Sequence, residues 1–426
     1  MNPKISDLKS QISNPKFPIS SPPLPDGWRW VKLGEVCEVV GGSTPDTSTS
    51  DYWNGEIVWV TPTDLGKLSG MTITITDRRI TPAGLQSCGT EILPIGTVIM
   101  SSRAPIGHLA IAGVSLCTNQ GCKSFVPSPD VDSVFLYWTL KQSVPGIQAL
   151  GSGATFAEVS KSALQQFEIP LPPLAEQRRI AGVLREQMAA VEEARAGAQA
   201  RLAAVKTLPA AFLRRVFPQP GQPLPDGWRW VKLGEVSSLQ SSYAFKSEWF
   251  EDKGTRLLRN ANIFQDHVSW DDVVCLSPHR RSEFREYDLR EGDIVLSLDR
   301  PIVSAGLKVT RLGQEDIPSL LLQRVGRFNL ETDFFADYLF FLLHTESFRA
   351  AITAHDYSLG VPHVSPAQIE AIDIPLPPLD EQHRIAGVLR EQMASVEKAR
   401  AAAEAELETI NALPAAFLRK AFQGEL

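Results

Sequence analysis

The sequence PLPDGWRWVKLGEV at Pro23–Val36 recurs without a change at Pro223–Val236, an offset of 200 residues. A second repeat relates Ile169–Phe217 to Ile374–Phe422, where 35 of 49 positions are identical at an offset of 205. The chain is therefore an internal duplication, and each copy consists of a constant Trp-containing box, a variable segment and a constant block.

The constant box predicts a turn at Pro25–Gly27 followed by a short strand anchored by Trp28 and Trp30. We expect this box to join the start of each globular unit to the end of a helix. A Trp-rich box can also be a binding platform, but an unchanged copy in both halves favours a shared framework.

The variable segments, 37–168 and 237–373, hold 132 and 137 residues and have diverged widely. Short landmarks survive in order, such as Gly96–Ser101 and Gly292–Ser297. Runs of β-branched and aromatic residues predict strands at 56–60, 71–76, 97–100, 109–112, 293–296 and 307–310, and short helices are expected at 133–141 and 332–343. Each copy is therefore predicted to be an α+β domain, with one fold carrying two different surfaces.

The constant blocks predict two long helices. The first begins near Pro173 and has no internal proline until Pro209, so about 35 residues can form one helix of roughly 50 Å. The matching stop in the second copy is Pro414. A 4–3 spacing of mostly apolar residues runs along both helices, at Ala181, Leu184, Met188, Val191, Arg195, Ala198, Leu202 and Val205, and at Ala386, Leu389, Met393, Val396, Arg400, Ala403, Leu407 and Ile410.

An apolar stripe of this kind, here called the seam, must pack against another surface. We expect the two helices to pair with each other, antiparallel about a pseudo-two-fold axis. The alternative is that each helix packs only on its own domain. The residues expected to form the contact between the helices are Leu184, Met188, Val191, Ala198, Leu202, Leu389, Met393, Val396, Ala403 and Leu407.

Composition limits the classes of function. The 426 residues include 42 Lys+Arg and 49 Asp+Glu, a net charge of −7, which argues against a protein that coats nucleic acid through bulk positive charge. The five cysteines are scattered and without CxxC spacing, as expected of reduced thiols. No apolar run is long enough to span a membrane and no secretory signal is visible, so a cytoplasmic protein is expected.

Signatures of catalysis are missing from the sequence. It contains no GxxxxGK[ST] loop for nucleotide phosphates, no HExxH, no GxSxG elbow and no Asn/Asp-Pro-Pro-Tyr/Phe run of amino-group DNA methyltransferases. The histidines show no paired spacing that would suggest a metal site. We therefore expect no catalysis within this chain.

The order of box, α+β segment and IPLPPLxEQ helix, followed by the same again, resembles the specificity (S) subunit of type I restriction–modification systems. The resemblance extends from about Pro23 over essentially the whole chain. Its specific marks include LPPLAEQ at Leu171–Gln177, LPPLDEQ at Leu376–Gln382, NQGCKSF at Asn119–Phe125 and RLLRNANI at Arg256–Ile263.

This resemblance implies a non-catalytic subunit with two target recognition domains separated by two long antiparallel helices. Each domain would read one half of a bipartite double-stranded DNA target, and the helices would set the spacer and dock two modification (methyltransferase) subunits. Restriction subunits would join the larger complex. S-adenosylmethionine, ATP and Mg would be bound by these partners, with no cofactor or metal on this chain.

The expected domains are an N-terminal tail at 1–22, taken to be disordered, recognition domains at 23–168 and 218–373, and spacer helix regions at 169–217 and 374–426. One alternative is a standalone DNA-binding regulator or anti-restriction protein built from the same domains. A fused restriction–methylation enzyme is a further alternative, which the missing methyltransferase and nuclease motifs disfavour.

Base readout requires Arg, Lys, Asn or Gln on loops, together with basic and hydroxyl groups on phosphates. The pairs Arg78-Arg79 and Arg280-Arg281, with Arg103 and Arg300 beside matched prolines, are the preferred candidates. The full set of predicted DNA-binding residues is Ser43, Thr44, Lys67, Arg78, Arg79, Arg103, Lys123, Lys246, Arg256, Arg259, Asn260, Asn262, Arg280, Arg281, Arg300 and Arg324.

Overall fold

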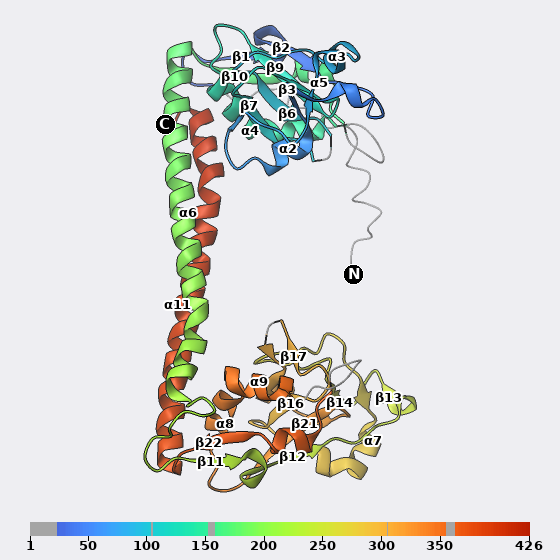
Figure 1. Cartoon of the computed structure of the whole chain (residues 1–426), viewed down its shortest axis with the longest axis vertical. Coiled ribbons are helices and arrows are strands. Elements are labelled where there is room, and N and C mark those ends of the chain that lie inside the picture. The colour runs from blue at the N-terminus through green and yellow to red at the C-terminus, as the bar shows by residue number, and fades with distance from the viewer. Residues whose placement is uncertain (1–23, 104, 152–157, 305, 355–362) are drawn as a thin grey trace, which may run out of the picture. The chain divides into compact units, whose positions relative to one another are not determined.

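A computed structural model describes residues 24–103, 105–151, 158–304, 306–354 and 363–426 (Figure 1). The chain divides into two compact units: unit 1 comprises Met1–Gly197 with Leu407–Leu426, and unit 2 comprises Ala198–Glu406. The N-terminal tail expected at 1–22 lies outside the described residues.

Unit 1 is built on a five-stranded sheet with the order β2-β9-β6-β7-β4 and a three-stranded sheet with the order β5-β3-β8. These strands are β2 (Cys37–Gly41), β3 (Trp53–Val60), β4 (Thr72–Ile73), β5 (Arg79–Ile80), β6 (Val98–Ser101), β7 (Leu109–Ala112), β8 (Leu116–Thr118) and β9 (Cys122–Pro127). The shorter helices are α1 (Leu33–Val36), α2 (Pro62–Lys67), α3 (Pro82–Gln86), α4 (Ser133–Ala149) and α5 (Lys161–Gln166). Helix α4 packs its apolar face, including Phe135 and Leu140, into the main core.

Unit 2 has two four-stranded sheets, with the orders β12-β21-β16-β19 and β13-β15-β14-β20, and a small β17-β18 hairpin. The strands are β12 (Ser237–Ser241), β13 (Phe250–Glu251), β14 (Thr255–Leu258), β15 (Cys275–Leu276), β16 (Ile294–Ser297), β17 (Ile302–Val303), β18 (Gly306–Leu307), β19 (Val309–Arg311), β20 (Ser319–Leu321) and β21 (Val325–Leu330). The short helices are α7 (Pro278–Arg281), α8 (Ala336–Leu343), α9 (Glu346–Ala354) and α10 (Pro366–Glu370).

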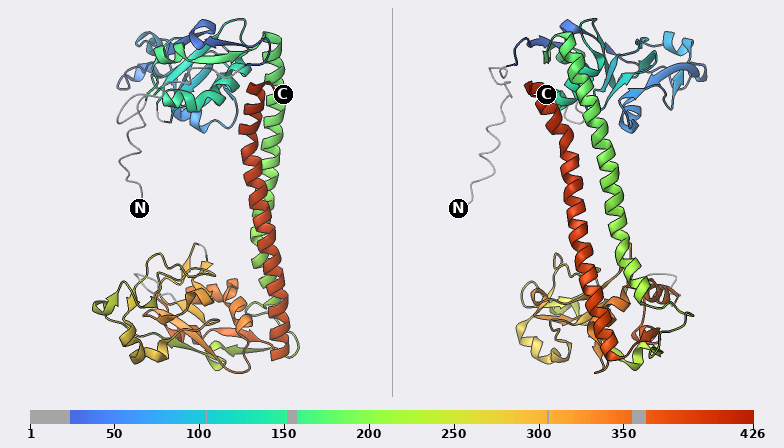
Figure 2. Two further views of the ribbon diagram at one scale, coloured as in Figure 1. Left: turned by 180° about the vertical axis from the view of Figure 1, so that it is seen from behind. Right: turned by 90° about the vertical axis from the view of Figure 1, so that its left-hand side faces the viewer.

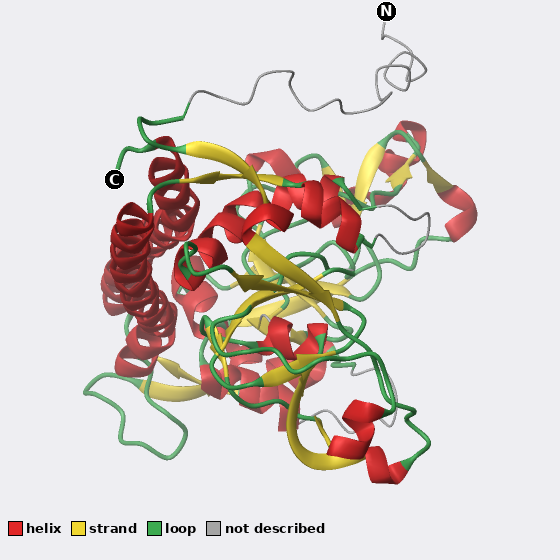
Figure 3. Ribbon diagram, turned by 90° about the horizontal axis from the view of Figure 1, so that it is seen from above, coloured by secondary structure: helices red, strands yellow, loops and turns green. Residues whose placement is uncertain are grey.

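Strand register shows that the two units share one fold. Ser101 lies opposite Cys122 in unit 1, and Ser297 lies opposite Val325 at the same point of unit 2. Both units also contain one parallel pair, β3 with β8 and β14 with β20, in their second sheet. Both combine helices and strands, drawn red and yellow in Figure 3, so the predicted pair of similar α+β domains is confirmed.

Two strand predictions are only partly correct. The run 71–76 forms a strand only at β4, and 307–310 is divided between β18 and β19. In the first case the alternating threonines predict an extended segment, but Ile75 is 70% exposed and has no core to pack against.

The constant box forms a strand that pairs with the strand leading into each long helix. In unit 1, β1 (Arg29–Lys32) pairs antiparallel with β10 (Glu168–Leu171). In unit 2, β11 (Arg229–Lys232) pairs in the same register with β22 (Asp373–Leu376). The box is therefore part of the framework that fixes where each helix begins.

A buried glutamine ties each helix to its unit. Gln177, 1% exposed, accepts a hydrogen bond from the N–H of Asp132 and donates to the carbonyls of Asp130 and Pro172. Gln382 makes the same three bonds in unit 2. The carbonyl and amino groups of this buried amide are thus hydrogen-bonded, which explains the physical role of the glutamine in both constant blocks.

The long helices do not end at the predicted prolines. Helix α6 extends from Leu174 to Val216 and α11 from Leu379 to Gln423, passing through Pro209 and Pro414. A proline inside a helix costs about 3 kcal/mol, because a hydrogen bond is lost and the ring crowds the preceding turn. Burial of the side chains beyond each proline offsets that cost, as they enter the hydrophobic cores: Leu213 and Phe217 in unit 2, and Leu418 and Ala421 in unit 1.

Within each unit the two helices pack against each other in opposite directions (Figure 2, green and red). In unit 1, Arg179 donates to the carbonyl of Leu426 and Arg195 to the side chain of Asn411, so the residue numbers run oppositely. In unit 2, Arg201 pairs with Glu406. The antiparallel pairing expected from the seam is therefore confirmed.

The residues of the predicted seam are all shielded from solvent at least in part, and four of them pack in the cores of the globular units: Leu184 and Met188 in unit 1, and Leu389 and Met393 in unit 2. Those buried are Leu184, Val191, Ala198, Leu389, Val396 and Ala403, and those half-buried are Met188, Leu202, Met393 and Leu407.

Candidate nucleic-acid interface

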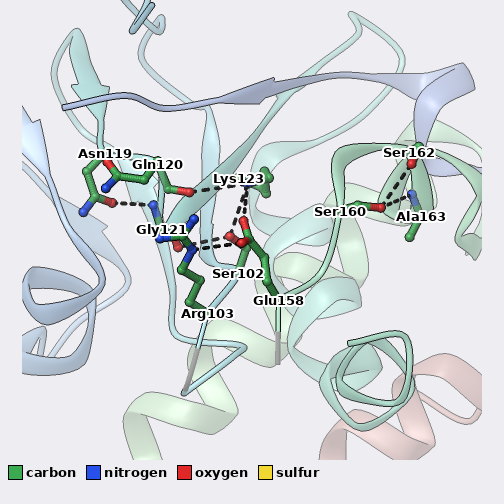
Figure 4. Close-up of polar contacts among 10 residues, drawn as sticks. All are labelled: Ser102, Arg103, Asn119, Gln120, Gly121, Lys123, Glu158, Ser160, Ser162 and Ala163. Carbon is green, nitrogen blue, oxygen red and sulfur yellow. Dashed lines mark hydrogen bonds and ion pairs between the residues drawn. The ribbon is translucent and has the colours of Figure 1, made fainter. Parts of the chain in front are cut away.

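In unit 1, a glutamate holds two basic side chains where β6 ends and β9 begins. Arg103 donates its Nε–H to Glu158 at 3.0 Å, and the Lys123 ammonium lies 3.4 Å from the other carboxylate oxygen (Figure 4). Lys123 also reaches the Gln120 carbonyl and the Ser102 hydroxyl. The Arg103 side chain is 46% exposed and that of Lys123 only 11%, so the arginine is the group presented outward.

The backbone identifies the equivalent position in unit 2. Arg103 forms a β-bridge with Glu158, and Asp299 forms the same bridge with His363. The N–H of Val159 bonds the Ser102 carbonyl, just as Val364 bonds Leu298. Asp299 therefore occupies the place of Arg103, and His363 the place of Glu158.

The acid lies on the opposite side of this β-bridge in unit 2. Asp299 is 4% exposed and is the acid of the unit 2 cluster, accepting from His363 Nδ1 at 2.6 Å and from Arg324 Nη1. Arg324 occupies the place of Gly121, because their carbonyls accept equivalent N–H groups, from Leu298 and Ser102. This cluster thus contains an arginine bonded to an acid in each unit, but the arginine comes from a different point of the same fold.

The unit 2 cluster borders a hollow of about 430 Å³. Its lining combines hydroxyl, amide and charged side chains with two apolar residues: Ser241, Ser242, Leu298, Asp299, Gln323, Arg324, His363 and Pro366. Lys308, which the Asp299 carboxylate influences electrostatically, donates to the carbonyl of Asn260. Burial lowers the pKa of Lys308, while the nearby Asp299 carboxylate acts in the opposite direction.

A second group of predicted residues in unit 1 surrounds two tryptophans. The Arg78 guanidinium lies 3.7 Å from the ring centroid of Trp53 and 5.2 Å from that of Trp59, a cation–π arrangement. The Trp59 indole donates to the Ser43 carbonyl, and Thr44 bonds the side chain of Gln120. The structure therefore brings Ser43, Thr44 and Arg78 to neighbouring segments, whereas Arg79 is exposed on β5 and Lys67 pairs with Asp77.

Unit 2 also places cations over indoles. Arg280 and Lys246 lie 4.5 and 5.5 Å from the Trp249 ring centroid. Arg256 lies 4.3 Å from the Trp270 ring and donates to the Glu315 carbonyl. Both arginines are half-buried, and a guanidinium placed over an aromatic ring is a group suited to phosphate or base contact.

Several predicted residues instead support the loop after β14. Asn262 is 2% exposed: its Oδ1 accepts from the N–H of Arg259, and its Nδ2 donates to the carbonyls of Ser269 and Asp272. Asp64 closes the same turn in unit 1 by accepting from the N–H of Thr61. Because the amide of Asn262 is fully used inside the protein, we assign it to holding the loop rather than to contacting a ligand.

The remaining predicted residues occupy different environments. Arg259 pairs with Asp272 at 2.8 Å, and Arg281 with Asp288 at 2.9 Å. Asn260 offers its carbonyl to Lys308. Arg300 is exposed, with a φ of 43°.

Sequence reasoning missed the acids and the histidine of the two clusters. Glu158 and His363 directly precede the matched pairs Val159-Ser160 and Val364-Ser365, so the alignment of the repeats did contain their signal. They were missed because a search for basic readout groups leaves out the acids that orient them.

Among the described residues, no group of three or more His, Cys, Asp or Glu side chains could hold a metal ion. The same residues include no helix long and apolar enough to cross a membrane. Burial raises the pKa of the Cys37, Cys117 and Cys122 thiols to about 12, which makes them poor nucleophiles at neutral pH.

Residues 25–195 and 225–407 match the family described as the type I restriction modification DNA specificity domain. The chain is 43% identical over 176 residues to the Escherichia coli type I restriction enzyme EcoAI specificity subunit, covering 41% of this chain and 30% of that protein. The MjaIX specificity subunit of Methanocaldococcus jannaschii is 40% identical over 163 residues, covering 38% of each chain. These two matches therefore span well under half of each relative, whereas the MjaVIII specificity subunit of the same organism, 24% identical, is matched over 86% of both chains.

Solved structures show the same fold. The HsdS subunit from Thermoanaerobacter tengcongensis superposes with a TM-score of 0.66 at 26% identity, covering 95% of this chain and 98% of that one. A chain from a solved type I R-M system superposes with a TM-score of 0.75 at 24% identity, covering 95% of this chain and 100% of that one.

Proposed function

Because the chain belongs to the type I restriction modification DNA specificity family, we propose that it is the DNA-recognition subunit of such a complex and that each unit reads one half of a bipartite target. The relatives reported above favour this function over a standalone regulator. The observation that carries the proposal is the duplicated fold with different side chains at one equivalent position: Arg103 and Glu158 in unit 1, Asp299 and His363 in unit 2.

The two units have the features needed to read different sequences. The box repeats without a change and the helix block is identical at 35 of 49 positions, whereas the segments in between diverge. Phosphate contacts position a protein on DNA and side chains at base edges provide specificity, so a constant frame with variable loops is the expected arrangement.

The net charge of −7 limits the affinity of this chain alone for DNA. Residues 237–373 contain 14 Lys+Arg against 21 Asp+Glu, so favourable contacts depend on local arginines such as Arg280 and Arg300. Additional phosphate contacts would come from partner subunits, and binding by the isolated chain would be weak and salt-dependent.

The proposal assigns the chemistry to other subunits. Two modification subunits carrying S-adenosylmethionine would dock on α6 and α11, and restriction subunits would supply ATP- and Mg-dependent activity. This chain would act without catalysing a reaction. The exposed Val388, 39% accessible on α11, is one apolar group available for such docking.

Exchange of one recognition module tests the function directly. Residues 237–373 would be replaced by the corresponding block of another family member, and the hybrid expressed with its modification subunits in a host lacking restriction subunits. Mapping of methylated adenines should show one changed half-site and one unchanged half-site. A motif unchanged in both halves would contradict the proposal, and the matched control is the unmodified chain expressed in the same host.

A further inference from the structure

We propose that Arg324 is a specificity-determining residue that reads a guanine in the half-site of unit 2, and that Asp299 and His363 are its positioning residues. This inference rests on the proposed function. It adds the identity of one side chain in unit 2 that contacts a base, and the identity of that base.

The backbone at Arg324 is the first observation. Arg324 has a φ of 68°, in the left-handed region that non-glycine residues rarely adopt. It lies in the short turn between β20 and β21. Its counterpart in unit 1, Gly121, does not have a positive φ, so the left-handed backbone at this point is specific to unit 2. A large side chain at a backbone conformation that favours glycine points to a functional role of that side chain.

The way Arg324 is held is the second observation. Its Nη1 donates to Asp299, whose other carboxylate oxygen is bonded by His363 at 2.6 Å. The Arg324 side chain is nevertheless 55% exposed, while that of Asp299 is 5% exposed. One end of the guanidinium is therefore anchored on a buried acid, and its Nε–Nη2 edge has no other hydrogen-bond partner among the described residues.

This free edge matches a guanine better than a phosphate. Two parallel N–H donors fit the O6 and N7 acceptors of guanine in the major groove. The Asp299 carboxylate compensates the arginine charge locally and would repel a phosphate oxygen brought to the same place. A neutral pair of acceptors meets no such repulsion, and anchoring reduces the side-chain entropy lost on binding.

The surroundings provide room and further polar groups. The hollow of about 430 Å³ beside the arginine is lined by Gln323, Ser241 and Ser242 as well as by the Arg324–Asp299–His363 cluster. Hydroxyl and amide groups at its edge can bond a neighbouring base or the sugar–phosphate backbone. The cluster is therefore built at a concave surface and not on a flat face.

Unit 1 provides an internal comparison. There the anchored arginine is Arg103, which uses Nε toward Glu158 and so leaves the opposite, Nη end of its guanidinium outward. Gly121, the counterpart of Arg324, has no side chain that could contact a base. The two units thus present arginine forks from different positions and with different edges, as expected for two different half-sites.

The test uses the full chain expressed with its modification subunits in a host lacking restriction subunits, with methylated adenines mapped genome-wide. Arg324→Gly removes the side chain at a backbone position suited to glycine and should fold normally. Arg324→Lys keeps the charge but loses the fork, Asp299→Asn weakens the anchor, and Arg290→Ala is the control for an exposed arginine outside the hollow.

Arg324→Gly and Arg324→Lys should both relax one G·C pair in a single half-site, by roughly 5- to 150-fold in discrimination, and leave the other half-site and the spacer unchanged. Asp299→Asn should relax the same base pair to a smaller extent, and Arg290→Ala should change no base. The inference is overturned if methylation falls uniformly without a change of motif, or if Arg324→Lys retains the original base, since both results indicate a phosphate contact. Absence of sequence-specific methylation by the unmodified chain would instead count against the proposed function.

Discussion

The Arg195 guanidinium donates a hydrogen bond of 2.9 Å from Nε to the side-chain oxygen of Asn411, joining the two long helices within unit 1. The repeat does not preserve this bond. Arg400 is the counterpart of Arg195, but the counterpart of Asn411 is Lys206, which cannot accept. Arg400 pairs instead with Glu397 and Glu404 on its own helix.

We predict that Arg195 and Asn411 are energetically coupled. A double-mutant cycle with Arg195→Ala and Asn411→Ala should give a coupling of about 0.5–1.5 kcal/mol in the free energy of unfolding, the range for a typical hydrogen bond, because solvent weakens this partly exposed charged donor. Urea unfolding followed by tryptophan fluorescence measures it. The same cycle at Arg400 and Lys206 is the matched control and should give a coupling near zero; equal couplings in both cycles would refute the prediction.

Phenylalanines at equivalent positions beyond the two helix prolines should contribute unequally. Phe217 is 1% exposed and lies 5.2 Å from the Tyr338 ring, whereas Phe422 is half-buried. Phe217→Ala should reduce the free energy of unfolding of unit 2 by about 3–5 kcal/mol. Phe422→Ala should reduce that of unit 1 by roughly half as much, since less apolar area leaves water there. Chemical unfolding of both variants measures the two losses of unfolding free energy. A larger loss for Phe422→Ala than for Phe217→Ala would contradict the prediction.

Spacer length should follow the length of the helix pair. Inserting four residues between Gly197 and Ala198, and four between Glu406 and Leu407, adds about 6 Å to both helices, or about two base pairs. Methylation mapping should then show the same two half-sites with a longer spacer.

The control for this experiment is insertion into α6 alone. It would move Arg195 and Arg201 about one helical turn further apart while Asn411 and Glu406 keep their spacing, so the Arg195–Asn411 and Arg201–Glu406 contacts cannot both form. We expect that variant to lose stability and activity. Loss of either half-site's identity in the double insertion would argue against a spacer role.

The cysteines provide a test of burial. Because the pKa values of Cys37, Cys117 and Cys122 are raised to about 12, only about one thiol in ten thousand is ionised at pH 8. A thiol reagent should therefore react first with the half-buried Cys88, and Cys88→Ser should abolish the fast phase. Denaturation should make all five reactive. A fast phase that persists in Cys88→Ser would show that one of the buried cores opens readily.

The sequence predicts the fold well where the repeat constrains it. Two copies of the box and helix block indicate two similar units and an antiparallel helix pair, and the apolar spacing from Leu184 to Ala198 corresponds to buried positions. The helix ends are not predictable in this way. Pro209 and Pro414 are local stop signals, and only the tertiary burial of Phe217 and Leu418 shows why the helices continue.

The candidate site is predictable only in part. Arg103 is among the preferred candidates because it lies beside a matched proline, and Arg324 belongs only to the full predicted set. Their acidic partners lie 55 and 25 positions away in the sequence. Composition cannot show which cation is anchored and which is buried: Lys123 and Asn262 have suitable chemistry but are used inside the protein. The pairing of strands distant in the sequence decides which of these side chains is exposed, and no local sequence pattern encodes that pairing.

Both hydrophobic cores are completed by residues from the opposite half of the chain, and this affects the order of events on the ribosome. The core of unit 2 includes Leu213 and has its last contributions at Leu389 and Met393, whereas that of unit 1 begins at Val31 and still requires Leu418 and Ala421. Unit 1 is therefore translated first and completed last. At 5–20 residues per second, the 28 residues from Met393 to Ala421 take roughly 1–6 s to synthesise, during which its apolar surface has no native cover.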